Sequence, residues 1–443
     1  MEKHSRLYLA AQGFACAAFL FGGKMAKTTI QSIRATEVLD SRGNPTVAVE
    51  VKTEGGTCGR AMVPSGASTG KYEAYEKRDG DSGRYLGKGR ISEVKAVEGE
   101  IATALLGMPA ENQKEIDSLL CALDGTPNKS RLGAGAILGV SMAVARAAAA
   151  ANGVELWEYL SADAKKRLPV PMMNILNGGA HADNPLDVQE FMIVPSGAAS
   201  FSEGLRIGTE IYHTLKTLLR ERGLSTGVGD EGGFAPEISS SEEALDLLVE
   251  AIHAAGYSEQ TVKISLDIAA SEWVTEDGYR LPKRGTHFTS EALAKRIEGL
   301  CQAYPILSVE DPLGEDDFKG FRMITAALDG KLVVGDDLFV TNTERLKAGI
   351  KACAANAILI KLNQIGTVSE TQRVMELASK NGYAYIVSHR SGETEDTFIA
   401  DFAVAMGAPL IKAGAPCRSE RVAKYNRLLL IEKALGTGAL YGL

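Results

Sequence analysis

The chain has no excess of positive charge and no closely paired cysteines. Its 48 Lys and Arg residues against 56 Asp and Glu residues give a net charge of −8, which argues against a nucleic-acid-binding surface, since such surfaces are basic. None of the 6 cysteines is in Cys-x-x-Cys spacing, which argues against a structural zinc site and fits a reducing compartment. A negative protein that handles an anionic substrate must gather its positive charge locally.

A long uninterrupted apolar run is also missing. The run from Leu7 to Phe21 is interrupted by Gln12, and it is too short and too polar for a transmembrane helix. It fits a signal peptide, whereas Met25 offers an alternative start that leads straight into strand-like sequence. We therefore treat residues 1–24 as an N-terminal extension, either signal-like or a misassigned start, and expect no membrane contact.

The first half of the chain has the pattern of a small α+β domain. In residues 28–63, Val47, Val49 and Val51 alternate with smaller or polar residues, which is typical of strands. From about Ser92 the pattern becomes helical and ends in the long segment 134–151. We expect residues 25–165 to form an α+β cap domain and residues 166–443 to form a second domain.

Three glycines near the start of that long helical segment resemble a dinucleotide-binding fingerprint. They are Gly133, Gly135 and Gly139. No strand precedes them, and they open into an alanine-rich helix, so the βαβ context of such a fingerprint is missing. Close helix packing is the better interpretation of these glycines.

The second half repeats one pattern, in which a short apolar run ends in a polar residue and a helical pattern follows. The polar ends of six such runs are Asp267, Glu310, Asp336, Lys361, His389 with Arg390, and Lys412. Repeated strand–helix units predict a parallel sheet, and six in a row within about 280 residues predict a closed (β/α)8 barrel. The polar ends should then meet at the barrel mouth, where such barrels keep their active sites.

Three of these polar ends are acids on successive strands. Neighbouring strands lie about 5 Å apart, so the carboxylates of Asp267, Glu310 and Asp336 would repel one another without a cation. Oxygen ligands alone suit a hard ion, Mg²⁺ above all. The alternative is that each acid is a solvated loop residue.

The next three polar ends carry positive charge. Lys361, Arg390 and Lys412 predict an anion site beside the acids, because Arg forks onto phosphate or carboxylate oxygens. The alternative is ordinary salt bridging across the mouth. A lysine in this place can also act as a base, since a nearby divalent cation and other positive charges lower its pKa.

Glycine-rich loops add further candidates. The loop 63–70 carries hydroxyl groups and has no strong apolar anchor, so it is either a lid that offers a ligand to metal or phosphate or a plain surface turn. In residues 229–234, glycines surround Glu231 and let the backbone approach a ligand closely. Glu231 is either a general acid or a structural residue.

Long segments of this chain resemble the enolase family, from about Thr28 to the end. The matching segments are Asp40–Thr46, Ser65–Gly70, Gly229–Pro236, Ser388–Thr394 and Gly414–Arg421. The resemblance implies the α/β class, with an N-terminal α+β cap domain followed by an enolase-type (β/α)8 barrel whose first units are irregular. It also implies the reversible dehydration of 2-phosphoglycerate to phosphoenolpyruvate, a reaction of glycolysis and gluconeogenesis.

The resemblance implies a role for each matched residue. Lys361 would remove the C2 proton and Glu231 would protonate the departing C3 hydroxyl, with an aci-carboxylate between the two steps. Asp267, Glu310 and Asp336 would bind the tighter of two Mg²⁺ ions and Ser68 the other, and the substrate-binding residues would be His181, Gln189, Glu190, His389, Arg390, Ser391 and Lys412. The enolase superfamily is a known example of a lysine base combined with one or two Mg²⁺ ions.

The resemblance further implies a cytoplasmic homodimer or higher homo-oligomer, with a secondary cell-surface or secreted fraction. Ala48 departs from the family, which often has a subunit-contacting Glu there. One alternative is a racemase or cycloisomerase of the same superfamily, which would need neither Ser68 nor the loop 229–236. Another is a surface-displayed binding protein; a catalytically dead version should show damage among the matched residues, and we find none.

Overall fold

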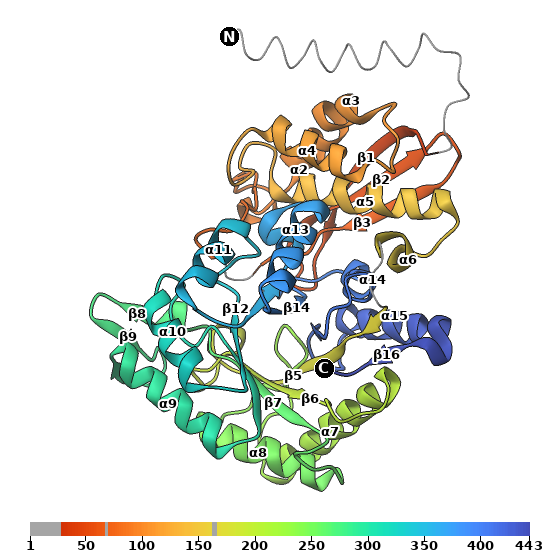
Figure 1. Ribbon diagram of the computed structural model, residues 1–443. Coiled ribbons are helices and arrows are strands. Elements are labelled where there is room, and N and C mark those ends of the chain that lie inside the picture. Colours follow the sequence, from red (N-terminus) through yellow and green to blue (C-terminus); the bar gives the residue numbers. More distant parts are fainter. Residues whose placement is uncertain (1–27, 67–69, 162–165) are drawn as a thin grey trace.

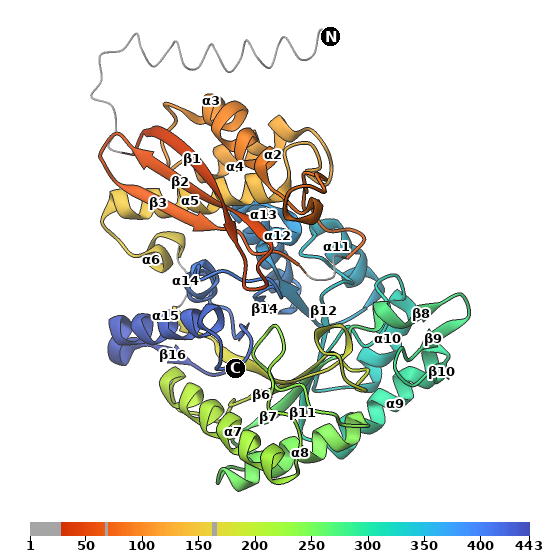
Figure 2. The same cartoon turned by 180° about the vertical axis from the view of Figure 1, so that it is seen from behind.

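The computed structural model describes residues 28–66, 70–161 and 166–443 (Figure 1). The N-terminal extension 1–24, the alternative start at Met25 and the candidate ligand Ser68 lie outside these residues. The described chain forms an N-terminal cap that sits on a larger barrel, and Figures 1 and 2 show the same stacking from opposite sides.

The cap combines an antiparallel sheet with helices. Its strands β1 (Ile30–Leu39), β2 (Pro45–Thr53) and β3 (Cys58–Met62) lie in the order β1-β2-β3. Its helices are α2 (Ile91–Ala96), α3 (Ala102–Leu105), α4 (Gln113–Asp124), α5 (Ala134–Asn152) and α6 (Leu156–Leu160). Val47, Val49 and Val51 are buried on the face of β2 that packs on α5, which confirms the strand expected from their alternation.

Helix α5 is the core of the cap. Among the described residues, it is the one helix long and apolar enough to cross a membrane by length and composition, yet 83% of its apolar 18-residue window is buried inside the protein. A Cβ atom on Gly139 would lie 2.7 Å from Val49 Cγ2, and one on Gly135 would lie 2.7 Å from Glu93 Oε2. The interpretation of these glycines as packing positions is therefore confirmed.

Replacing Gly139 with alanine should lower the free energy of unfolding. The added methyl group meets Val49 and Val63, and overpacking costs about 1–3 kcal/mol, which exceeds the gain of up to about 1 kcal/mol in helix propensity. Gly299→Ala is the matched control, because Gly299 is a helical glycine with open space where its Cβ would be. Urea unfolding of both variants checks this, and a G139A protein as stable as G299A would contradict the packing role.

The second domain is a closed barrel of eight strands. Its strands are β5 (Val170–Asn177), β6 (Glu190–Val194), β7 (Lys263–Asp267), β11 (Ile306–Glu310), β12 (Leu332–Gly335), β13 (Ala357–Ile360), β14 (Ala384–Ser388) and β15 (Leu410–Lys412), joined in that order around the barrel. The six runs expected from the sequence are β7 and β11 to β15. Strands of this kind are buried on both faces: Ala357 and Leu359 face the barrel interior, while Ile358 and Ile360 join the core under the helices.

Helices surround the barrel. They are α7 (Phe201–Glu221), α8 (Ser241–Ala254), α9 (Ser290–Ala303), α10 (Phe318–Ala327), α11 (Thr343–Ala352), α12 (Leu362–Ile365), α13 (Val368–Lys380), α14 (Phe398–Ala405) and α15 (Ser419–Leu435). Several begin at a polar side chain that accepts a backbone N–H of the first turn, which fixes where the helix starts. These capping residues are Ser200, Ser240, Thr289, Asp317, Asn342 and Thr367.

The barrel departs from an all-parallel sheet at β6, which is antiparallel to both β5 and β7. The physical reason is the connection: the loop 178–189 carries no crossover helix, so β6 must return beside β5 in the opposite direction. Its first residue, Glu190, therefore pairs with Asn177 and with Asp267, the last residues of β5 and β7. The six runs that the repeat predicted are parallel, as expected, and the reversal at β6 lies in the irregular first units that the family resemblance implied.

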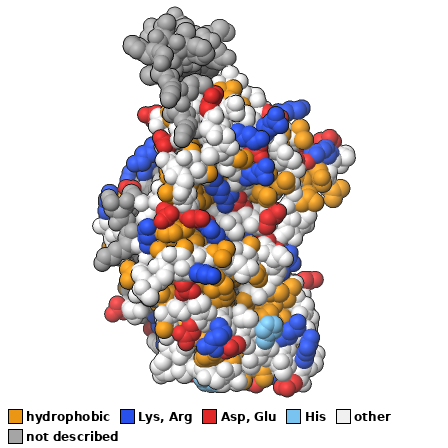
Figure 3. All heavy atoms as spheres, turned by 90° about the vertical axis from the view of Figure 1, so that its right-hand side faces the viewer, with side chains coloured by type: hydrophobic (Ala, Val, Ile, Leu, Met, Phe, Trp, Pro, Cys, Tyr) orange, Lys and Arg blue, Asp and Glu red, His pale blue; other side chains and the backbone are white. Residues whose placement is uncertain are grey.

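Short strands complete the fold. Strand β4 (Arg167–Leu168) pairs with β16 (Leu440–Tyr441), and β8 (Val274–Thr275), β9 (Gly278–Arg280) and β10 (His287–Phe288) form a small sheet beside the barrel. Figure 3 shows one face of the molecule, on which Lys and Arg side chains are interspersed with Asp and Glu side chains over both domains.

Cap and barrel are joined at the mouth of the barrel. Ser65 exchanges two backbone hydrogen bonds with Gly392, of 2.8 and 2.9 Å, and its hydroxyl donates to Asp40. Arg146 of α5 forms an ion pair with Asp396 at 2.6 Å. These contacts hold the loop that follows β3 against the loop that follows β14.

Candidate active site

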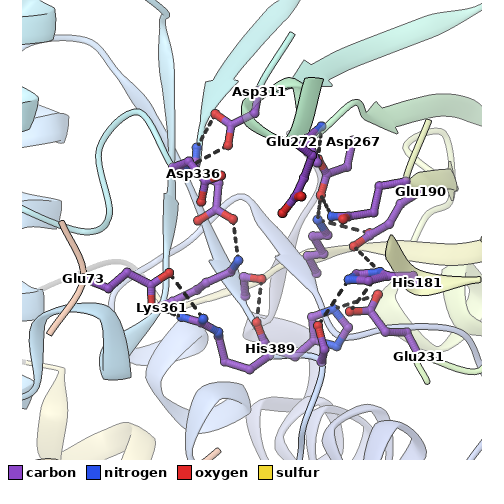
Figure 4. Close-up of a pocket in the computed structure, with 17 residues that line it drawn as sticks. Glu73, His181, Glu190, Glu231, Asp267, Glu272, Asp311, Asp336, Lys361 and His389 are labelled. Carbon is purple, nitrogen blue, oxygen red and sulfur yellow. Dashed lines mark hydrogen bonds and ion pairs between the residues drawn. The ribbon is translucent and has the colours of Figure 1, made fainter. Parts of the chain in front are cut away.

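One pocket at the barrel mouth collects most of the candidates that the sequence indicated (Figure 4). Every described candidate except Glu310 lines this pocket, and Glu310 lies just behind it, bonded to Lys412. The barrel register explains the convergence, because Glu310 pairs with Asp267, and Ser388 pairs with Lys412, at adjacent strand ends. Side chains distant in the sequence therefore point into the same space.

Lys412 lies at the centre of the acidic cluster. Its Nζ donates to Asp267 Oδ2 at 2.9 Å and to both oxygens of Glu310 at 3.0 Å, and it is 3.1 Å from Glu190 Oε2. Burial alone lowers the pKa of Lys412, but these carboxylates hold it well above its ordinary value. Burial and the charge of Asp267 in turn raise the pKa of Glu310. The positive charge of Lys412 is thus salt-bridged at the mouth, which is the alternative that the sequence left open for the positively charged strand ends.

Lys361 is held by Asp336. Its Nζ donates to Asp336 Oδ2, while Asp336 Oδ1 accepts a hydrogen bond of 2.8 Å from Gln364. Burial lowers the pKa of Lys361, and Arg390 and Lys412 lower it further, but the charge of Asp336 outweighs them and the pKa is raised. Arg390 and Lys412 thus act in the direction that the sequence predicted, while the pairing with Asp336, of which the sequence gave no sign, acts against them in the described contacts.

The acids of this mouth fit a divalent cation. Asp267, Glu310 and Asp336 are buried and follow adjacent strands, and they offer only oxygen atoms, which suits a hard ion. Two further groups have donor atoms within 4.8 Å of one another: Asp311 with Asp336 and Asp337, and His181 with Glu190 and Glu231. In the first group, Asp311 also accepts the backbone N–H groups of Asp336 and Asp337 at 3.0 and 2.7 Å.

Arg390 meets a residue from the cap. Its NH1 donates to Glu73 Oε2 at 2.8 Å and to Asn363 Oδ1 at 3.2 Å, and both side chains of the ion pair are buried. Its neighbour Ser391 has its Oγ 3.3 Å from Nε2 of His181, which lies in the β5–β6 loop. The surroundings of Arg390 and Ser391 are therefore assembled from the cap, the loop after β14 and the β5–β6 loop.

Glu231 is surrounded by nitrogen atoms. Asn174 donates to its Oε2 at 3.0 Å, His389 Nε2 lies 3.5 Å from the same oxygen, and His181 Nδ1 lies 3.7 Å from Oε1. Burial raises the pKa of Glu231, but its neighbours His389, His181 and Arg421 lower it more strongly. The pKa of Glu190 is raised well above its ordinary value by burial and by Glu231. The pKa values of the two carboxyl groups therefore differ strongly. As the pH falls, Glu190 takes up a proton before Glu231 does.

Sequence reasoning missed several residues of the pocket. Asp311 and Asp337 directly follow Glu310 and Asp336, so their place after strand ends could have identified them. Glu73 and Glu272 also line the pocket. Glu73 comes shortly after the loop 63–70 and Glu272 shortly after β7, but neither is a strand end or a residue of a motif, and only the folded chain brings them to the mouth.

This fold and this mouth define a barrel enzyme of the TIM type, with carboxylates that fit a divalent cation beside lysines and an arginine that fit an anionic substrate. Residues 165–442 match the family model described as "Enolase, C-terminal TIM barrel domain", and residues 30–160 match "Enolase, N-terminal domain". A curated relative named Enolase, from Kineococcus radiotolerans, is 57% identical over 93% of this chain and 96% of its own length. The Enolase of Acidothermus cellulolyticus has the same identity and the same coverage of both chains. The chain belongs to the enolase family.

Proposed function

We propose that this chain acts as a phosphopyruvate hydratase, with Lys361 as the base and Glu231 as the acid. The reaction is the reversible dehydration of 2-phosphoglycerate to phosphoenolpyruvate, a lyase step of glycolysis. The observation that carries the activity is 57% identity to curated enolases over 93% of the chain. The residue roles are supported by the convergence of the matched positions in one pocket.

The first chemical step is removal of the C2 proton by Lys361. A base must be neutral, and in the described contacts Asp336 keeps Lys361 charged. Asp267, Glu310 and Asp336 would hold Mg²⁺, which would supply positive charge to the developing anion, and Asp336 would then be less available to Lys361. Burial, Arg390 and Lys412 then all favour the neutral amine. The Lys412 ammonium stabilises the negative charge that develops on the aci-carboxylate.

The second step is loss of the C3 hydroxyl, with a proton from Glu231. Glu190 is the carboxyl group of the pair with the raised pKa, so Glu231 needs a proton before it can act as an acid. The His181 ring lies between the two, with Nδ1 3.6 Å from Glu190 Oε1 and 3.7 Å from Glu231 Oε1. We infer that Glu190 gives its proton to His181 Nδ1 and that the same nitrogen then gives a proton to Glu231.

The remaining pocket residues orient the substrate. Arg390, Ser391 and His181 are proposed to hold its phosphate, and Gln189 and His389 to complete the wall around the carbon atoms. Gln189 donates to Asp267 Oδ2 at 3.4 Å, which ties it to the metal-binding acids. Two Mg²⁺ ions per site, the first at Asp267, Glu310 and Asp336 and the second with Ser68, remain our proposal.

Mg²⁺ removal gives a direct test. Phosphoenolpyruvate formation by the purified full chain, followed by its ultraviolet absorbance, should fall at least about a hundredfold with excess chelator, because the developing charge loses its counter-charge. Added Mg²⁺ should restore the rate, and calorimetric titration should count two ions per chain. Full turnover in chelator would exclude the metal role. A folded, Mg²⁺-loaded protein that is inactive on 2-phosphoglycerate but active on an unphosphorylated acid would indicate a racemase or cycloisomerase.

We also propose that the chain works in the cytoplasm as a homodimer or higher homo-oligomer, with a domain division at about residue 165. Cys58, Cys121, Cys301, Cys353 and Cys417 are all free thiols, which supports a reducing compartment. The division falls between the end of α6 at Leu160 and the start of β4 at Arg167. A secondary surface or secreted fraction is a separate proposal.

A further inference from the structure

A buried arginine lies behind the pocket and does not line it. Arg421, in the first turn of α15, has a side chain with 0% exposure. Its nearest carboxylate oxygen, Glu420 Oε1, is 3.5 Å from Nε, and Nε makes no hydrogen bond to any of the described residues. Burying a charge with so little direct pairing costs free energy. The other contacts of the Arg421 guanidinium must therefore compensate for this cost.

Those contacts all go to segments that carry the proposed catalytic residues. NH1 donates to the Arg390 carbonyl at 2.7 Å and lies 2.6 Å from His389 Nδ1. NH2 donates to the Ser391 carbonyl at 2.6 Å and to the Asp230 carbonyl at 3.1 Å. One guanidinium therefore joins the loop after β14 to the glycine-rich loop that holds Glu231.

The contact with His389 determines where the imidazole carries its proton. A guanidinium donates hydrogen bonds and cannot accept one, so His389 Nδ1 must be the acceptor. The single ring proton is then on Nε2, the atom 3.5 Å from Glu231 Oε2. A second proton on Nδ1 would face the guanidinium directly. In agreement, the pKa of His389 is lowered to about 4. Burial is the largest cause, Arg421 and Lys412 lower the pKa further, and Glu231 acts in the opposite direction.

We propose that Arg421 is a positioning residue for the dehydration, holding His389 as the Nε2–H tautomer with that N–H directed at Glu231. This inference rests on the proposed role of Glu231 as the acid. A hydrogen bond from His389 Nε2–H to Glu231 favours the carboxylate form of Glu231. The bond therefore helps Glu231 release its proton to the departing hydroxyl. The same guanidinium keeps the Asp230 and Ser391 backbones at their present separation.

Nitrogen-15 NMR of histidine side chains tests the proposal on the unmodified full chain. The chain has 6 histidines, and His389 is assigned by comparison with His389→Gln. The expected signal is a neutral ring with an unprotonated Nδ1 throughout the neutral pH range. An Nδ1–H tautomer, or a doubly protonated ring at neutral pH, would overturn the proposal.

Variants then connect the tautomer to the rate. Arg421→Gln should release the tautomer and lower kcat by about 10- to 100-fold with a smaller change in KM, and Arg421→Met, which has no donor, is the second variant in case the first does not fold. Arg427→Gln is the matched control, because Arg427 is on the same helix but binds Asp401 and Glu155. An unchanged His389 signal in a folded Arg421 variant would sink the idea. The NMR readout needs no turnover, so its failure is distinguishable from failure of the proposed function.

Discussion

Replacing Lys361 with alanine is expected to lower kcat by roughly 10² to 10⁴-fold, the usual contribution of a positioned general base. The reason is geometric: Lys361 follows β13 directly at the mouth, and its side chain, 14% exposed, pairs with Asp336. The variant should also lose exchange of the C2 proton of 2-phosphoglycerate with deuterated solvent. Proton NMR of the substrate measures that exchange separately from product formation.

Two other variants make the Lys361 result specific. Glu231→Gln should block loss of the hydroxyl while C2 exchange continues, because the base is intact and only the acid is missing. Lys347→Ala is the surface control, since Lys347 is an exposed lysine of α11 paired with Glu344, and its kcat should match the unmodified chain. C2 exchange that survives in K361A would exclude Lys361 as the base, whatever the effect on turnover.

Replacing Lys412 with methionine is expected to have the next largest effect, on both rate and stability. The change leaves Asp267, Glu310 and Glu190 buried without the ammonium that all three face. Breaking a buried ion pair from one side costs about 3–5 kcal/mol of unfolding free energy. Loss of a charge that stabilises the developing anion should lower kcat by about 10² to 10³-fold. Chemical denaturation with and without Mg²⁺, together with kcat, measures both effects.

The loss of stability should shrink when Mg²⁺ is present, because the ion would supply the unpaired carboxylates with positive charge that the variant has lost. Lys129→Met is the matched control, since Lys129 is also buried and pairs with Glu370 at 3.1 Å outside the pocket. It should lose stability and keep its kcat. A K412M protein with normal stability in chelator, or with full activity in Mg²⁺, would contradict the arrangement described here.

Much of the site could be predicted because strand ends are a local property. Asp267, Glu310 and Lys412 are the last residues of their strands, while Asp336 and Lys361 directly follow theirs, and an apolar run followed by a polar residue is visible in the sequence. Parallel strands in a closed barrel bring such ends to one mouth. The family resemblance then supplied residues that no repeat indicated, such as His181 and Glu190.

Other features depend on partners far apart in the chain and could not be predicted. Glu73 and Arg390 are 317 residues apart, and Arg421 reaches Asp230 across 191 residues. The reversal of β6 follows from the loop before it, which has no crossover helix. The apolar pattern of the strand itself does not indicate in which direction the strand runs. The raised pKa of Lys361 follows from an ion pair whose geometry exists only after the strands have met.

By itself, the sequence determined that the chain has an α+β cap and a (β/α)8 barrel, where the six regular strand–helix units lie, and which acidic and basic side chains stand at the barrel mouth. These features can be read from the sequence because the periodic pattern of buried residues repeats within a few residues. Only the tertiary structure decided which charges are paired, which way β6 runs, and how Arg421 is placed to hold the proposed tautomer of His389. Such contacts depend on distances of a few ångströms between segments hundreds of residues apart, and packing of the whole chain sets those distances.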